Sequence, residues 1–235
     1  MLTIDPSKMQ LRRGDRVLDL GCGEGRHTIG LALLSDVDVV GVDLDLQDLS
    51  VAATRGAEYF DASARCHWCC ADGLRLPFAD NSFDKIICSE VLEHIPDYQG
   101  MLEEIERILS KDGLLAISVP RRWPEKICWW LSDAYHQVDG GHIRIFKARK
   151  LRDEIAAFGF AHYARHWAHA LHAPFWWLKC LFWKTQDSNL LVKAYHRMLV
   201  WDLLQKPWLT QTLERLLNPV LGKSVVMYFK REPGL

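Results

Sequence analysis

Short apolar runs alternate with helix-like patterns over the first 160 residues of this 235-residue chain. The apolar runs predict strands over residues 16–20, 37–42, 65–71, 83–89 and 114–119. The periodic segments predict helices over residues 26–34, 46–59 and 99–109, and the tripeptide KDG is expected to link the last helix to the last strand. Regular alternation of strand and helix predicts an α/β fold with a doubly wound, mostly parallel sheet.

The pattern changes after Pro120. Residues 120–146 form an aromatic and basic connection far longer than the usual length of about 2 to 6 residues. A helix over 147–159, a strand over 161–167 and an antiparallel last strand over 224–231 complete a predicted seven-stranded sheet. Between those last two strands, residues 170–222 are mostly helical, and apolar residues recur at helical spacing at Leu191, Ala194, Tyr195, Met198 and Trp201.

Both long insertions, 120–146 and 170–222, leave from the carboxyl end of the predicted sheet. Open α/β folds bind their ligands at that end. We therefore expect the insertions to form a lid over a pocket, within a single domain of residues 1–235.

Charge and tryptophan divide the chain into unlike halves. Residues 1–120 hold 11 Lys and Arg against 21 Asp and Glu, whereas residues 121–235 hold 18 against 9. Nine of the ten tryptophans lie from Trp123 onward, and eight lie in the two insertions. The acidic first half argues against binding of a nucleic-acid backbone.

The start MLTIDPSKMQ lacks the basic and apolar regions of a secretory signal, and no apolar run approaches the roughly 18 to 20 residues that span a bilayer. A cytoplasmic location is the expectation, and the seven cysteines are expected to be reduced and mostly buried. Cys66 and Cys69 have metal-ligand spacing, but on a strand they point to opposite faces. His162, His166, His169 and His172 would share a helical face, yet the predicted strand splits them, so no metal site is expected.

The segment VLDLGCGEGRHT, residues 17–28, raises a question of ligand chemistry. Its glycines form G-x-G-x-G, whereas a dinucleotide-binding turn has a sixth-position glycine where this chain has Arg26. Acidic residues also fall at or just beyond several strand ends; these are Asp19, Glu24, Asp43, Asp45, Asp72 and Glu90. Such acids would repel a pyrophosphate and favour S-adenosylmethionine, which has a ribose diol, an ammonium group and a positive sulfur. The alternative for Asp45 and Glu24 is that they cap helices or face water.

The chain resembles the class I S-adenosylmethionine-dependent methyltransferases, in particular the small-molecule group (type 11) that includes the quinone methyltransferases. The resemblance rests on VLDLGCGEGRHT, VVGVDLD, ADGLRLPFADNSFDKIICSEVLEHIPD, GLLAISVP and GHIRIF...LRDEIAAFGF, in that order and spacing. It covers residues 11–160 and the final strand. The tryptophan-rich insertion after residue 169 departs from the quinone enzymes.

The resemblance implies how the cofactor is held. Asp19 would lie near the methionine ammonium, Asp43 would bind the ribose hydroxyls, and Asp72 would meet the adenine. Glu90 would lie beside the sulfonium and the entering acceptor. The full implied set of cofactor-binding residues is Asp19, Gly21, Gly23, Gly25, Asp43, Leu44, Asp72, Gly73, Leu74, Ser89 and Glu90.

Transfer to a hydroxyl oxygen would need a base, and histidine is the usual base near neutral pH. His142 is the first candidate because it ends the first insertion on the carboxyl side of the sheet, and His94 is the second. Tyr135 and His136 are weaker candidates from the same insertion. The alternative for both His142 and His94 is a structural histidine bonded to backbone.

The segment HAPFWWLKCLFWK, residues 172–184, has two interpretations. Tryptophans beside lysines are typical of an interfacial helix at a membrane surface, and the same tryptophans could instead pack within the lid. Either interpretation favours a small hydrophobic or amphiphilic acceptor, lipid-like or quinone-like. Two other function classes are a cofactor-binding partner or regulator without transfer activity, and a nicotinamide oxidoreductase, which Asp19 and the glycine spacing disfavour.

Overall fold

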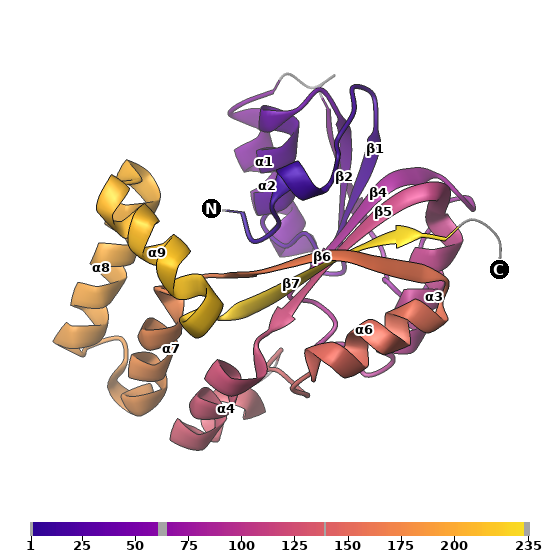
Figure 1. The fold of residues 1–235 in the computed structure, drawn as a ribbon. Coiled ribbons are helices and arrows are strands. Elements are labelled where there is room, and N and C mark those ends of the chain that lie inside the picture. The colour runs from indigo at the N-terminus through magenta and orange to yellow at the C-terminus, as the bar shows by residue number, and fades with distance from the viewer. Residues whose placement is uncertain (1, 61–64, 139, 233–235) are drawn as a thin grey trace.

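The computed structural model describes residues 2–60, 65–138 and 140–232 (Figure 1). Within these residues, seven strands form one sheet in the order β3-β2-β1-β4-β5-β7-β6. β1 to β5 run parallel, and β7 runs antiparallel to both β5 and β6. The predicted doubly wound, mostly parallel seven-stranded sheet with an antiparallel last strand is confirmed. The strands are β1 (Arg16–Leu20), β2 (Asp38–Asp43), β3 (Cys66–Cys70), β4 (Phe83–Ser89), β5 (Leu109–Pro120), β6 (Phe160–Ala168) and β7 (Ser224–Arg231).

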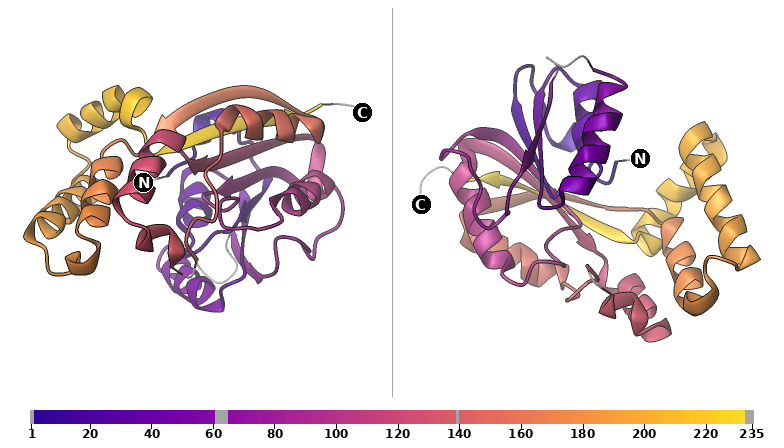
Figure 2. Two further views of the ribbon diagram at one scale, coloured as in Figure 1. Left: turned by 90° about the horizontal axis from the view of Figure 1, so that it is seen from below. Right: turned by 180° about the vertical axis from the view of Figure 1, so that it is seen from behind.

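Helices cover both faces of the sheet, as Figures 1 and 2 show. Leu18 and Ile86 point into a large apolar cluster on the side of α3 and α6, whereas their neighbours Val17 and Ile87 point into a smaller cluster on the side of α1. Alternate residues of a strand point to opposite faces, so strands buried on both faces read as continuous apolar runs. The helices that cover the two faces are α1 (Arg26–Leu34), α2 (Leu46–Ala57), α3 (Tyr98–Ile108) and α6 (Ala148–Ala157). A 3-10 turn, η1 (Pro6–Lys8), precedes β1.

β5 begins earlier than the sequence predicts. It starts at Leu109, directly where α3 ends, and not after the KDG tripeptide. Phe83 pairs with Leu109 and Lys85 pairs with Leu114, so residues 110–113 bulge out between two successive pairs. The expected link is therefore a bulge inside the strand, which local sequence does not distinguish from a turn.

The two long insertions form helices at the carboxyl end of the sheet, and we call these helices the cap (Figure 2). Residues 120–146 contain α4 (Arg122–Leu131) and α5 (Ala134–Gln137), while Asp139 lies outside the described residues. Residues 170–222 contain α7 (His172–Leu181), the 3-10 turn η2 (Trp183–Thr185), α8 (Leu190–Gln205) and α9 (Trp208–Leu221).

The tryptophans of residues 172–184 pack within the cap. Nε1 of Trp177 donates to the carbonyl oxygen of Pro124 at 3.0 Å, and its ring lies 5.6 Å from that of Trp123. The ring of Trp183 lies 6.0 Å from that of Tyr135. α7 is thereby tied to α4, and η2 to α5, so the two insertions form one aromatic cluster. No helix among the described residues has the length and apolar character to cross a bilayer.

α8 buries only part of the set that its apolar spacing marks: Tyr195 and Met198 pack against the cluster that contains the buried Val192 and Leu199. Val192, Leu199 and Asp202 are buried, whereas Leu191 is 61% exposed and Trp201 is 49% exposed. Apolar residues extend around much of this helix, so the hydrophobic pattern does not select one face. Tertiary contacts select it instead.

The cysteines are unpaired thiols. Cys22, Cys88, Cys128 and Cys180 are buried, as expected of most of them, but the expectation is wrong for Cys70, which is exposed. Cys66 and Cys69 are half-buried on the edge strand β3. An edge strand covers its side chains less completely than a central strand does.

Candidate active site

The glycine turn after β1 has a backbone that side chains rarely allow. The φ angle is +72° at Gly21, +49° at Gly23 and +80° at Gly25. A Cβ on Gly21 would lie 2.3 Å from Cγ2 of Val91, and a Cβ on Gly25 would lie 2.6 Å from Cη2 of Trp68. Gly21 is thus required for packing against Val91 and Gly25 for packing against β3, whereas a Cβ on Gly23 would lie 3.7 Å from Oδ2 of Asp48, so Gly23 leaves room for a ligand against the backbone.

A cavity of about 220 Å³ opens beside this turn. Three carboxylates line it at the ends of different strands, and the described residues of its lining include no lysine or arginine. We call it the acidic cavity. Seven of the eleven predicted cofactor-binding residues line it, and these are Gly21, Gly23, Asp43, Leu44, Asp72, Gly73 and Glu90. His94, the second candidate base, lines it as well.

Asp43 links the acidic cavity to the glycine turn. Its Oδ2 accepts from the backbone N–H of Gly23 at 2.8 Å, and its Oδ1 accepts from that of Asp45 at 3.0 Å. A carboxylate has about four lone-pair sites, so each oxygen of Asp43 retains acceptor capacity for a further hydroxyl. This arrangement fits a ribose diol.

The two acids with an alternative structural interpretation take that alternative. Asp45 caps α2, where its side chain accepts from the N–H of Gln47 at 2.7 Å. Glu24 forms an ion pair with Arg55. Neither lines the acidic cavity.

Asp19 is buried behind the turn and does not line the acidic cavity. Its Oδ2 accepts from both the backbone N–H and the Oγ1 of Thr28, at 3.0 and 2.7 Å. Burial raises the pKa of Asp19 to about 6, although the two hydrogen bonds oppose the shift. Gly25, Leu74 and Ser89 are the other predicted residues outside the lining.

Glu90 lies directly after β4 in a left-handed backbone conformation, with φ +59°. Its Oε1 accepts from Oγ of Ser118 at 2.8 Å, and Ser118 lies 2.9 Å from Oγ of Ser89. Ser89 therefore supports Glu90 through Ser118. Left-handed non-glycine residues cost free energy and cluster at functional sites.

His142 is held by a carboxylate that sequence reasoning did not single out. Its Nδ1 lies 2.6 Å from Oε1 of Glu125, a buried residue of α4 that also accepts from Trp129 at 3.1 Å and from Tyr135 at 3.3 Å. Burial alone would raise the pKa of Glu125, but the hydrogen bond from His142 and nearby charge lower it. The ionised carboxylate assigns the proton to Nδ1, which leaves Nε2 as the basic nitrogen.

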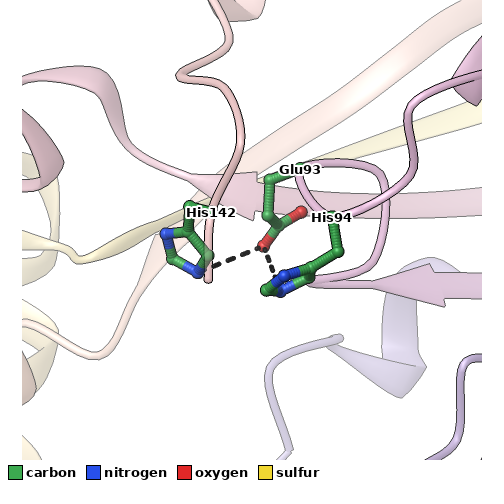
Figure 3. Close-up of side chains that lie close together, drawn as sticks. All are labelled: Glu93, His94 and His142. Atoms are coloured by element: carbon green, nitrogen blue, oxygen red, sulfur yellow. Dashed lines mark ion pairs between the residues drawn. The ribbon is translucent and has the colours of Figure 1, made fainter. Parts of the chain in front are cut away.

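His94 and His142 approach a second buried carboxylate, that of Glu93 (Figure 3). Nε2 of each histidine lies 4.0 Å from Oε1 of Glu93. Both oxygens of Glu93 are without a hydrogen-bond partner among the described residues, and burial, reinforced by Glu90, raises the pKa of this carboxyl well above its usual value. The rings of His94 and His142 lie 4.9 Å apart. Burial, and to a lesser extent His142, lowers the pKa of His94.

The donor atoms of Glu93, His94 and His142 lie within 4.8 Å of one another, close enough to be gathered by a metal ion. Zinc ligands at about 2.0–2.1 Å from the ion lie closer together than the 4.0 Å seen here, so binding would draw the three side chains inward. A raised carboxyl pKa also opposes the ionised form that a metal requires. The arrangement therefore fits a base, His142, beside a buried carboxyl of raised pKa better than a metal centre.

A second cavity, of about 260 Å³, meets the acidic cavity at Glu90, which lines both. His142, Arg26 and Lys223 line its wall, so we call it the basic cavity. A third cavity, of about 300 Å³, continues from it inside the cap. Phe175, Leu199 and Leu203 line this third one, the apolar cavity, and it shares with the basic cavity the residues Arg26, His169, His172 and Trp176.

Several residues that line these cavities or, like Glu125, contact a residue of their lining were not predicted as site residues. Glu125 and Lys223 lie in segments without a recognisable motif, so only the folded structure brings them to the site. Arg26 ends the glycine motif itself, and His169 and His172 lie at the start of the second insertion. Tyr135, a weaker candidate, contacts Glu125, whereas His136 stacks on Trp129 with ring centres 4.1 Å apart.

Comparison with known proteins defines the family. A family model described as a methyltransferase domain matches residues 11–188. Sterol 24-C-methyltransferase erg6 of Aspergillus fumigatus is 32% identical over 150 residues, which are 63% of this chain and 37% of that protein. The 27-O-demethylrifamycin SV methyltransferase of Amycolatopsis mediterranei is 37% identical over 109 residues, which are 46% of this chain and 40% of that protein. The chain thus spans about two fifths of the length of these curated relatives.

Among solved structures, a putative sarcosine dimethylglycine methyltransferase from Galdieria sulphuraria matches with a TM-score of 0.66 at 18% identity, covering 98% of this chain and 83% of that one. At this identity the likeness concerns the fold. The family match, the fold and the acid-lined glycine turn agree. The chain belongs to the class I S-adenosylmethionine-dependent methyltransferases of the small-molecule type, and its cofactor is S-adenosylmethionine.

Proposed function

We propose that the protein transfers a methyl group from S-adenosylmethionine to an oxygen atom of a hydrophobic or amphiphilic small molecule. The observation that carries the proposal is the position of Glu90, which lines both the acidic cavity and the basic cavity. A cofactor on one side and an acceptor on the other would meet at this residue. His142, held by Glu125, lies on the acceptor side.

The lining of the acidic cavity supports cofactor binding there. Asp43 would bind the ribose hydroxyls, Asp72 would meet the adenine, and Glu90 would lie near the positive sulfur. Asp19 would attract the ammonium group electrostatically from behind the turn. Its carboxylate also holds the start of α1 through its hydrogen bonds with Thr28. Acids without cations suit a ligand that is positively charged and has no phosphate.

When bound, S-adenosylmethionine supplies a methyl group on a positively charged sulfur, which is an activated leaving group. The chain must then align the acceptor oxygen with that methyl group and exclude water. Nε2 of His142 would take the proton of the acceptor hydroxyl, so that the oxygen can accept the methyl group while the sulfur leaves with the bond electrons. Glu125 stabilises the resulting imidazolium and fixes the ring orientation. His94 would be the second base.

The apolar cavity supports a hydrophobic acceptor. It opens from the basic cavity and offers aromatic and aliphatic side chains in the cap, including Phe175, Leu199 and Leu203. The sterol and rifamycin relatives are named for methylation of a sterol at carbon and of an antibiotic at oxygen. The Glu125–His142 pair favours oxygen, because a hydroxyl must lose its proton. Contact with a membrane surface through residues 172–184 stays a prediction. Trp177 and Trp183 pack inside the cap, which is the alternative interpretation of these tryptophans.

Calorimetry with S-adenosylmethionine and with NADH tests the cofactor, and transfer of a labelled methyl group to a lipid extract tests the acceptor. His142→Ala should lower the transfer rate about 100-fold or more while leaving cofactor affinity within about twofold. The exposed His67→Ala serves as the matched control. An unchanged rate in His142→Ala would remove this residue from the role of base.

A further inference from the structure

The basic cavity has a charge pattern that methyl transfer alone does not require. Arg26 and Lys223 both line it, and neither makes an ion pair within 4.0 Å with any carboxylate of the described residues. Guanidinium Nη2 of Arg26 donates to Oγ1 of Thr3 at 2.9 Å, and Nζ of Lys223 lies 5.4 Å from the ring centre of Trp176. Glu90 is the acid of this lining, and it also faces the acidic cavity.

Neutral hydrogen-bonding groups accompany the two cations. His169 is 8% exposed, and its Nε2 pairs with Oγ1 of Thr3 at 3.0 Å. Nδ1 of His169 and Nδ1 of His172 are buried and have no hydrogen-bond partner in the part of the chain that the structure describes. Burial lowers the pKa of His172 to about 4 and that of His169 well below its usual value, so both rings are neutral near pH 7.

Backbone conformation marks the same place. Glu90 and His169 come from segments far apart in the sequence. Both line the basic cavity, and both have a left-handed backbone, with φ +59° and +66°. Left-handed residues other than glycine are uncommon and cluster at functional sites.

We propose that the acceptor is an amphiphile with one anionic headgroup, a carboxylate or a phosphate monoester, held between Arg26 and Lys223 with its hydrocarbon part in the apolar cavity. The inference rests on the proposed function, because it names the class of acceptor that the same site takes. Arg26 lines both the basic and the apolar cavity, at the junction where a headgroup meets its chain. Neither cation lines the acidic cavity, so they are placed for the acceptor and not for the cofactor.

Calorimetry below micelle-forming concentrations tests the headgroup on the full chain. The probes share one chain length and are decanoate, decyl phosphate, decanol and decyltrimethylammonium. Decanoate or decyl phosphate should bind at least tenfold more tightly than decanol, and the better of the two identifies the headgroup. Decyltrimethylammonium should bind more weakly still. Equal binding of the anionic probes and decanol would overturn the inference.

Variants tie the preference to the two cations. Lys223→Gln and Arg26→Gln should each reduce anionic binding tenfold or more while leaving decanol binding unchanged, and Lys223→Glu should favour the cationic probe. Lys126→Gln, an exposed lysine of α4, is the matched control and should change nothing. Loss of S-adenosylmethionine binding in Arg26→Gln with unchanged decanoate binding would assign Arg26 to the cofactor and overturn the inference.

The two proposals fail differently. Methyl transfer to neutral amphiphiles only would leave the proposed function intact and contradict the anionic headgroup. Tight decanoate binding without methyl transfer to any acceptor, anionic or neutral, would contradict the proposed function and leave the binding site intact.

Discussion

Glu125→Gln tests how the chain prepares its base. The substitution keeps the shape of a buried side chain and its acceptor oxygen but removes the charge that faces Nδ1 of His142 at 2.6 Å. A hydrogen bond to a charged group contributes about 1.5–3 kcal/mol, and about 1.4 kcal/mol corresponds to tenfold in rate. The maximal transfer rate should therefore fall about 10- to 160-fold.

The assay is transfer of a labelled methyl group to a lipid extract at saturating cofactor, across a range of pH. Cofactor affinity should stay within about twofold, since Glu125 does not line the acidic cavity. Glu104→Gln removes a carboxylate bonded to Arg107 outside the three cavities and serves as the matched control. A full rate in Glu125→Gln would refute the reasoning.

Three further predictions concern the glycine turn, the buried Asp19, and the cluster of Glu93, His94 and His142. Gly21→Ala should weaken cofactor binding at least tenfold, because the added Cβ would contact Val91. Gly14→Ala is the control: at φ +82° its added Cβ has no atom of the described residues within 4 Å, so binding should be unchanged. Equal losses in the two variants would contradict the role of the turn. Burial raises the pKa of Asp19 in the folded protein to about 6, above the ordinary 3.8, so the ionised side chain lowers the free energy of unfolding by about 3 kcal/mol above pH 6. Asp19→Asn should therefore raise the free energy of unfolding at pH 7.5. Denaturant titrations should show that this gain shrinks below pH 6. EDTA should leave methyl transfer unchanged, and Zn²⁺ should inhibit it by binding at His142. Transfer that is lost with EDTA and restored by Zn²⁺ would mean that Glu93 and the two histidines form a metal centre.

The central sheet follows from local patterns, and the cap does not. Strands such as β1 and β4 are buried on both faces, so their apolar runs identify them directly, and the acids at their ends mark the cofactor side. The buried face of α8 depends on contacts with α7, which no periodicity in α8 contains.

The acceptor side shows the same limit. His142 could be singled out because it ends an insertion at the carboxyl end of the sheet. Glu125 is one acid of α4 among aromatic and basic residues, and only the docking of α4 against residue 142 gives it a role. Lys223 and Arg26 lie almost 200 positions apart in the sequence and meet in one cavity because β7 returns beside β5.

The central claim is that a cofactor in the acidic cavity gives its methyl group to an acceptor in the basic cavity. The most direct measurement uses S-adenosylmethionine with a labelled methyl group, a lipid extract, and the protein either unchanged or as Asp43→Ala. The account predicts label in an extractable product with the unchanged protein and at least a tenfold loss with Asp43→Ala at limiting cofactor. Cofactor binding without label in any extract would contradict the claim and favour a binding partner or regulator.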